Sequence, residues 1–293
     1  MSNSIAAVSV SLEHVGYVGS DLTELILCAR RLGLLPTEPE ALLSRNNATG
    51  SVDSLQQQSC HVVMPASYLE LTAVASDDPT HHLAAWRARG TGAHILALGS
   101  ADLEGVWQQC ALAGLRPTAI ARASRPIRYG ATHGDAEFDW FMLPATVFSS
   151  ALLCVVRNRT PSLVYQVDVM EHPLRAVALE EVSIIVSNPA RTLARQLSWL
   201  GEADQIHADG CEIPLQTGRL SLLTASAAGM RWGERFAGPR WAGGGLAAVV
   251  LRVADLTQAQ KYLQSAGVAV TRVGDELRIH CHDANGAVLA LHG

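Results

Sequence analysis

The feature that most constrains this chain of 293 residues is an internal repeat with four copies. Each copy begins with a short β-rich run, continues through an Asp or Asn suited to cap a helix, and closes a helical stretch with a glycine. The helices are predicted at residues 22–32, 103–113, 190–200 and 256–266, and the closing glycines are Gly33, Gly114, Gly201 and Gly267. Four agreements of this kind indicate four copies of one structural unit.

Shorter strand-like pieces follow each helix, so the unit is a βαβββ module. Such a module leaves one face of its sheet uncovered and must pair with another module to bury it. The sequence therefore predicts two domains of two modules each, residues 1–170 and 171–293, with the break in the polar stretch 166–178. The coil-rich segment 36–58 is predicted to be a loop on the ligand side of the first module.

Composition limits the classes of function. Apolar residues make up 48% of the chain and charged residues 17%, which is typical of a compact globular protein. The net charge of −5 and the absence of a basic run argue against nucleic acid as a partner. No apolar run approaches the roughly 20 residues that cross a bilayer. The six cysteines form no CxxC pair, which suits reduced thiols, and we expect a cytoplasmic protein.

Two histidines and one carboxylate stand at matching places in the modules of the first half. His14 lies on the first strand of module one, and we align His94 with it on the first strand of module two. Glu70 lies on the last strand of module one. Two imidazoles and a carboxylate can occupy one face of a divalent metal such as Fe²⁺, Mn²⁺, Zn²⁺ or Ni²⁺ and leave positions open for a substrate.

The residues around these side chains resemble a known family. The sequence from Leu12 to Val15, with Asp21 and with Tyr68-Leu69-Glu70-Leu71, is similar to the first module of glyoxalase-like (vicinal oxygen chelate) proteins. The sequence around His94 is similar to the second module. The resemblance implies an α+β fold in which four βαβββ modules pair into two open barrels. It also implies His14, Glu70 and His94 as ligands of a divalent metal in the N-terminal barrel.

Further side chains are candidates near that site. The family's fourth ligand would fall near residues 154–158, where Arg157 is predicted to hold an anionic substrate. His133 and Tyr129 lie in a loop of module two and are candidates for proton transfer, although a surface position is the alternative for both. His61 is expected to line the first barrel and contact substrate. His81 and His82 follow a turn signal and are expected to be solvated.

The matching positions in the C-terminal half are Glu181, Ser221 or Leu222, Ala248 and Ala290. This set cannot build a metal site, so the C-terminal half is predicted to be structural.

The predicted function is a metal-dependent enzyme of the glyoxalase-like type acting on a small oxygenated organic molecule, aromatic molecules included. A ring-cleaving dioxygenase and an isomerase or lyase both fit this description. One alternative is a non-catalytic protein that sequesters a small molecule without a metal. Another is an enzyme that uses His14, Glu70 or Arg157 directly, without a metal. A homodimer is expected because paired-module folds often dimerise.

Overall fold

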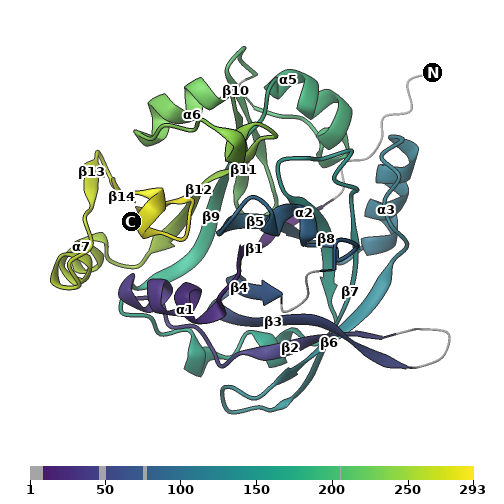
Figure 1. The fold of residues 1–293 in the computed structure, drawn as a ribbon, viewed down its shortest axis with the longest axis horizontal. Coiled ribbons are helices and arrows are strands. Elements are labelled where there is room, and N and C mark those ends of the chain that lie inside the picture. Colours follow the sequence, from purple (N-terminus) through teal and green to yellow (C-terminus); the bar gives the residue numbers. More distant parts are fainter. Residues whose placement is uncertain (1–8, 46–50, 75–77, 205) are drawn as a thin grey trace.

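The structure is a computed structural model, which describes residues 9–45, 51–74, 78–204 and 206–293. Its strands form two sheets that follow one another along the chain and pack side by side (Figure 1). The first sheet ends at Asn158 and the second begins at Ala176. The predicted division between residues 170 and 171 falls in this linker, which contains the short helix α4 (Pro161–Val164) and the 3₁₀ turn η1 (Val167–Val169).

The first sheet is a closed barrel with the strand order β1-β4-β3-β2-β6-β7-β8-β5. Each of the first two modules contributes four consecutive strands, and the two sets join through the β1–β5 and β2–β6 pairs. The strands are β1 (Ser11–Gly19), β2 (Glu40–Arg45), β3 (Val52–Met64), β4 (Ser67–Val74), β5 (Gly92–Gly99), β6 (Ala121–Ile127), β7 (Gly134–Met142) and β8 (Leu152–Asn158). The paired-module α+β architecture is thus confirmed, with a first barrel that is closed and not open.

The segment 36–58 is not the loop that the sequence predicted. Its described residues include all of β2 and the first half of β3, which pair with each other in antiparallel register. From Asp53 to Ser59 every residue of β3 except Leu55 is polar, a composition that favours coil. Because β2 also pairs with β6, this segment closes the barrel.

The second sheet has seven strands in the order β10-β11-β9-β12-β15-β14-β13. In the described part of the third module, two strands follow the helical stretch where the other modules have three. The strands are β9 (Ala176–Ile185), β10 (Gly210–Pro214), β11 (Arg219–Leu223), β12 (Gly245–Val253), β13 (Thr271–Val273), β14 (Glu276–Ile279) and β15 (Val288–His292). The curled sheet carries an additional helix, α6 (Ala225–Trp232), on one face.

The repeat-derived helices occur where the sequence placed them. They are α1 (Leu22–Arg31), α3 (Leu103–Leu112), α7 (Leu256–Ser265) and, in the third module, α5 (Pro189–Thr192) continued by the π-helical η2 (Leu193–Leu197) and the 3₁₀ turn η3 (Ser198–Leu200). The side chains of Asp21, Asp102, Asn188 and Asp255 each accept a hydrogen bond from a backbone N–H of the first turn. The closing glycines of the three regular helices are left-handed, with φ from 69° to 76°, a conformation that costs a glycine little. The remaining short elements are α2 (Ala84–Arg87), η4 (Pro239–Trp241) and η5 (Cys281–Asp283).

The barrel strands alternate between its interior and a shared core. Residues such as Val15 and Tyr17 of β1 point out of the barrel into one apolar cluster with Leu179 of β9 and Leu289 of β15. Val18, on the other face of β1, belongs to a smaller cluster inside the barrel. The outward residues therefore hold the two sheets together, and the inward ones leave room for a cavity.

All six cysteines are free thiols, as the sequence predicted. No helix in the described part of the chain is both long enough and apolar enough to span a membrane.

Candidate active site

The first barrel encloses a cavity of about 500 Å³, including the space open to solvent at its mouth. Most of its polar lining comes from β1, β4, β3 and β6, which follow one another around the barrel with only β2 between β3 and β6. Its apolar lining comes largely from β7, β8 and β5, which make up the opposite side. The polar side chains are His14, Gln57, Tyr68, Glu70, His82 and Arg125, and the apolar ones include Ile95, Phe138, Trp140, Leu152 and Val156. The cavity is therefore polar on one side and apolar on the other.

A bulge in β1 brings two neighbouring residues into contact. Leu12 pairs with Leu98 and His14 with Ala97, so Glu13 has no partner of its own on β5. Glu13 Oε2 lies 2.5 Å from His14 Nδ1. Bulges of this kind redirect side chains, often beside active sites. An ionised carboxylate can only accept hydrogen bonds, so the N–H group at His14 Nδ1 is the donor in this contact. The other ring nitrogen, Nε2, is left facing the cavity.

Two tyrosines support the pair formed by Glu13 and His14. Tyr68 stacks on the imidazole of His14, with ring centroids 4.4 Å apart and planes 17° from parallel. Tyr165, from the linker after the barrel, donates its hydroxyl to Glu13 Oε1 at 3.1 Å. Burial, together with the charge of Glu13, raises the pKa of Tyr165 well above its ordinary value, so the tyrosine stays a donor.

Glu70 connects His14 to a buried arginine. Glu70 Oε2 lies 3.7 Å from His14 Nε2, and Glu70 Oε1 accepts a hydrogen bond from Arg125 Nη2 at 3.3 Å. Arg125 Nη1 also bonds the imidazole of His61. Burial and the nearby positive charge of Arg125 hold the pKa of His61 well below its ordinary value. His61 is thus the partner of the cavity-lining Arg125, while the cavity lining itself does not include His61.

The structure does not bring His94 to His14 and Glu70. The residue of β5 that lines the cavity is Ile95, and His94 points to the opposite face, where Nε2 donates to Gly90 O at 2.9 Å. The physical reason is a slip of one residue in the alignment: His14 precedes its helix cap Asp21 by seven residues, whereas His94 precedes Asp102 by eight. A shift of one residue in a strand moves the side chain to the other face.

Arg157 also lies outside the cavity. It donates to Glu104 Oε2 and Oε1 at 2.6 and 2.9 Å and to Asp139 Oδ2 at 2.8 Å, which ties β8 to α3 on the outer surface of the barrel. Cys154 and Val156 face the interior, so Arg157 between Val156 and Asn158 faces outward. The arginine that the cavity contains is Arg125.

The two loop candidates for proton transfer lie elsewhere. His133 is exposed just before β7. Tyr129 is buried beside the site, with its ring centroid 6.5 Å from that of His61, and its hydroxyl donates to Val164 O at 3.3 Å. Burial raises the pKa of Tyr129 to about 12. Tyr129 is therefore a packing residue behind the polar wall.

Sequence reasoning missed Arg125, Gln57 and His82. In β6, Arg125 lies two residues from each of the buried Ala123 and Ile127 and shares their face of the strand, which marks it as a charge facing the interior. Gln57 lies in the segment that we had predicted to be a loop. His82 was expected to be solvated but lines the cavity. Burial, together with the charge of the neighbouring His81, lowers the pKa of His82 to about 4.

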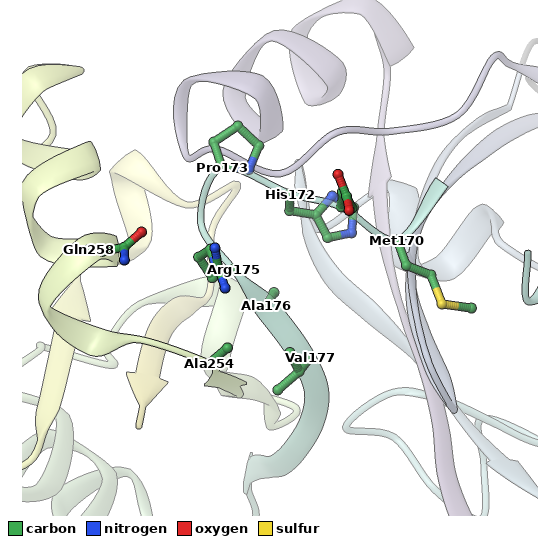
Figure 2. A pocket seen from close by; sticks show the side chains of 9 residues that line it. Met170, His172, Pro173, Arg175, Ala176, Val177, Ala254 and Gln258 are labelled. Carbon is green, nitrogen blue, oxygen red and sulfur yellow. The ribbon is translucent and has the colours of Figure 1, made fainter. Parts of the chain in front are cut away.

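A second, more open cavity lies between the linker and α7, away from these groups (Figure 2). Gln258 extends toward it from α7, Arg175 approaches from the end of the linker, and Ala176 from the start of β9. His172, the titratable ring on its border, is already engaged on both sides: Nε2 bonds Val63 O at 2.8 Å and Nδ1 accepts from Leu35 N at 3.1 Å. This cavity therefore has no imidazole free to act on a ligand.

In the second sheet, the first-strand position that corresponds to His14 is occupied by Glu181, whose role is structural. Glu181 is fully buried and accepts hydrogen bonds from Ser183, Ser221, Arg219 and Arg231. Although burial acts to raise it, the two arginines hold the pKa of Glu181 below its ordinary value. Apolar residues of α6 and the segment after it cover the strands that would otherwise face a cavity.

Comparisons with solved structures agree with this fold. A hypothetical protein from Staphylococcus aureus superposes with a TM-score of 0.61 at 9% identity, covering 97% of this chain and 99% of that one. A xylose isomerase-like TIM barrel/4-hydroxyphenylpyruvate dioxygenase fusion protein gives a TM-score of 0.58 at 12% identity, and the match covers 98% of this chain and 50% of that chain. A mutant of 4-hydroxymandelate synthase from Streptomyces coelicolor gives 0.54 at 13% identity, covering 98% and 93%. At these identities the likeness concerns the fold alone.

Sequence comparison identifies the family. None of the curated protein sequences compared with the chain matches it. Residues 12–201 match the glyoxalase-like domain family, a span that contains both modules of the closed barrel and more than half of the chain. The chain therefore belongs to the glyoxalase-like family.

Proposed function

We propose that this protein is an enzyme that transfers a proton to or from a small oxygenated organic molecule held in the β1–β8 barrel. The observation that carries the proposal is the contact of 2.5 Å between Glu13 Oε2 and His14 Nδ1, with His14 Nε2 directed at the cavity. A carboxylate behind an imidazole fixes its tautomer and stabilises the imidazolium that forms when the ring takes a proton. His14 is thus the general base, and Glu13 is its positioning residue.

The neighbouring groups extend this chemistry. When His14 takes up a proton at Nε2, a second carboxylate lies nearby to stabilise the imidazolium: Glu70 Oε2 is 3.7 Å from Nε2. Arg125, hydrogen-bonded to Glu70, supplies positive charge and an N–H donor close to the oxygen of a substrate that gains negative charge. Fixed donors of this type stabilise a developing oxyanion most strongly where water is excluded. Deprotonation next to a carbonyl or hydroxyl group, as in an isomerase or lyase, is the reaction class that these residues support.

The predicted three-ligand metal centre fits the residues poorly. A site of that kind takes two histidines and a carboxylate, but the β5 side chain that faces His14 and Glu70 is Ile95. Cys154 of β8 also lines the cavity, but burial raises its pKa, so a metal would have to displace the proton of a buried neutral thiol there.

Glu70 is in addition already paired with the buried guanidinium of Arg125, whose charge opposes a second cation. Within the described residues, no group of three or more His, Cys, Asp and Glu side chains is placed to hold a metal ion. The proposed step therefore uses the side chains of the chain itself.

Solvent-deuterium exchange tests the proposal. Uncharged hydroxyketones, 2-hydroxyacetophenone among them, would be incubated with the protein in D₂O, and loss of the proton signal beside the carbonyl would be followed by NMR. We expect the wild type to accelerate exchange and His14→Ala to lose at least about a hundredfold in rate, the usual contribution of a general base. Glu13→Gln should also slow exchange, because the amide can donate to Nδ1 and favours the other tautomer of His14.

Glu104→Gln is the matched control, since Glu104 lies on the outer surface of the barrel. Exchange that persists in His14→Ala would contradict the proposal.

A second experiment measures the metal content of the wild type, His14→Ala and Glu70→Ala by elemental analysis. Stoichiometric metal that disappears in both variants would favour the metal-dependent dioxygenase, isomerase or lyase predicted from the sequence. Binding of the ketones without exchange would favour the sequestering protein.

A further inference from the structure

The charges inside the barrel point to the class of substrate, an inference that rests on the proposed function and narrows it. We infer that Glu70 neutralises Arg125 and thereby makes the cavity select uncharged hydroxylated molecules with an apolar body over carboxylates. A buried arginine in a ligand cavity ordinarily indicates an anionic ligand. Here its charge is already matched by a residue of the barrel wall.

The charge pairs are complete before any ligand binds. The side chains of Arg125 and Glu70 are each 6% exposed, and Arg125 Nη2 lies 3.3 Å from Glu70 Oε1. Glu13 is buried with its two carboxylate oxygens on His14 and Tyr165. A ligand carboxylate would therefore bring a third negative group next to Glu13 and Glu70, with one guanidinium to share among them.

Three other titratable groups around the cavity, His61, His82 and Tyr68, do not add positive charge at neutral pH. Burial and the charge of Arg125 keep the pKa of His61 well below its ordinary value, and burial lowers the pKa of His82 to about 4. Tyr68 stays a neutral phenol because burial and the carboxylates of Glu13 and Glu70 raise its pKa. Arg125 is thus the single permanent cation among the residues that line the cavity.

Two buried polar atoms of the lining show what a ligand must supply. Arg125 Nε is a donor and Gln57 Oε1 an acceptor, and among the described residues neither has a hydrogen-bond partner. Gln57 is 3% exposed and Arg125 5% exposed, so bulk water does not satisfy these atoms either. A hydroxyl group both accepts and donates, so it can satisfy either of these atoms without bringing a charge into the barrel.

The opposite wall defines the rest of the molecule. Phe138, Trp140 and Leu152 face the cavity from β7 and β8, across the barrel from Glu70. The cavity measures about 500 Å³ including the space at its mouth, so the ligand is small. An aromatic or short aliphatic body against this wall removes apolar surface from water.

Three probes that share one ring and differ in charge test the inference: benzyl alcohol, benzoate and benzylamine at pH 7.5. Their dissociation constants would be measured by ligand-observed NMR titration of the full-length chain, with no catalytic turnover required. We expect the wild type to bind benzyl alcohol at least tenfold more tightly than benzoate. Glu70→Gln leaves Arg125 without its partner charge, so benzoate should gain at least tenfold in affinity and become the preferred probe. Glu104→Gln, a carboxylate lost from the outside of the barrel, should keep the wild-type order.

The reciprocal variant guards against a result caused by misfolding. Arg125→Gln leaves Glu70 unpaired, so benzylamine should gain affinity while benzoate does not, and thermal melts would establish that each variant is folded. Wild-type protein that binds benzoate as tightly as benzyl alcohol, that binds none of the probes, or that keeps its order of preference in Glu70→Gln would overturn the inference. None of these results bears on proton transfer, because the exchange assay with His14→Ala is independent of the affinities.

Discussion

Replacing His94 with glutamine should remove part of the acid sensitivity of the fold. His94 is 3% exposed, and its Nε2–H donates to Gly90 O at 2.9 Å. Its Nδ1 is buried and has no hydrogen-bond partner among the described residues. Burial, supported by the positive charges of Arg240 and Arg89 and opposed by the bond to Gly90, lowers the pKa of His94 to about 4. The ring is therefore neutral in the folded protein at every pH at which the protein is expected to work.

The size and sign of the effect follow from this pKa. In the unfolded chain His94 titrates near its ordinary value of 6.5. Between pH 6.5 and about 4, the unfolded chain binds a proton that the folded chain does not, so the free energy of unfolding falls as the pH falls. At about 1.4 kcal/mol for each pH unit, the loss over this interval amounts to about 3 kcal/mol. Above pH 6.5 both states are neutral at this position and the contribution is constant.

Urea denaturation at a series of pH values from 7.5 to 4.5 measures the effect. The amide of His94→Gln can keep the bond to Gly90 O and cannot titrate, so the variant should lose less stability on acidification than the wild type, with the gap widening below pH 6.5. His133→Gln replaces an exposed histidine and should follow the wild-type curve. Parallel curves for His94→Gln and the wild type would refute the reasoning, because they would show that His94 titrates alike in the folded and unfolded chains.

Two further substitutions test other features of the fold. Glu181→Ala should lower the free energy of unfolding by about 3 kcal/mol, because it leaves the guanidinium groups of Arg219 and Arg231 without their buried partner; a change below about 1 kcal/mol in urea denaturation would contradict this. Asp102→Ala removes the cap that accepts from Gly105 N at 2.9 Å and should cost about 1 kcal/mol, which thermal unfolding would detect as a lower Tm.

The fold could be predicted because its signals are local and repeated. An aspartate or asparagine before each helix and a glycine after it act within a few residues of where they stand, and four copies reinforced one another. The strand β2 could not be recognised in this way. Its residues pair with β3 and β6, and the partners in β6 are about 80 positions away in the sequence, so its formation depends on closure of the barrel and not on its own composition.

The site was predictable only in part for a related reason. His14 and Glu70 were found because both stand on strands whose place in the module is clear, and the structure sets them 3.7 Å apart. His94 was misplaced because strands allow no error of one residue, while the repeat fixed the register only to within one. The role of Glu13 depends on a bulge between Leu12 and His14, a local departure from alternation that a regular strand pattern does not reveal.

The corresponding first-strand residues of the two halves, His14 and Glu181, have opposite environments, and the difference indicates which half binds a ligand. His14 and Glu181 each lie on the first strand of their module, seven residues before its helix cap. Glu181 has its oxygens bound by two arginines and two serines, and α6 packs apolar side chains over the neighbouring strands, so Glu181 is not free to exchange a proton with a ligand. His14 keeps one nitrogen toward an amphipathic cavity, next to an arginine and a glutamine with unfilled hydrogen-bonding capacity. At this matched position the carboxylate of Glu181 is fully satisfied by the protein, whereas the cavity beside His14 contains two buried polar atoms, Arg125 Nε and Gln57 Oε1, without a partner among the described residues. Because an unsatisfied buried polar atom destabilises a protein unless a ligand completes it, the search for a ligand is directed to the first barrel.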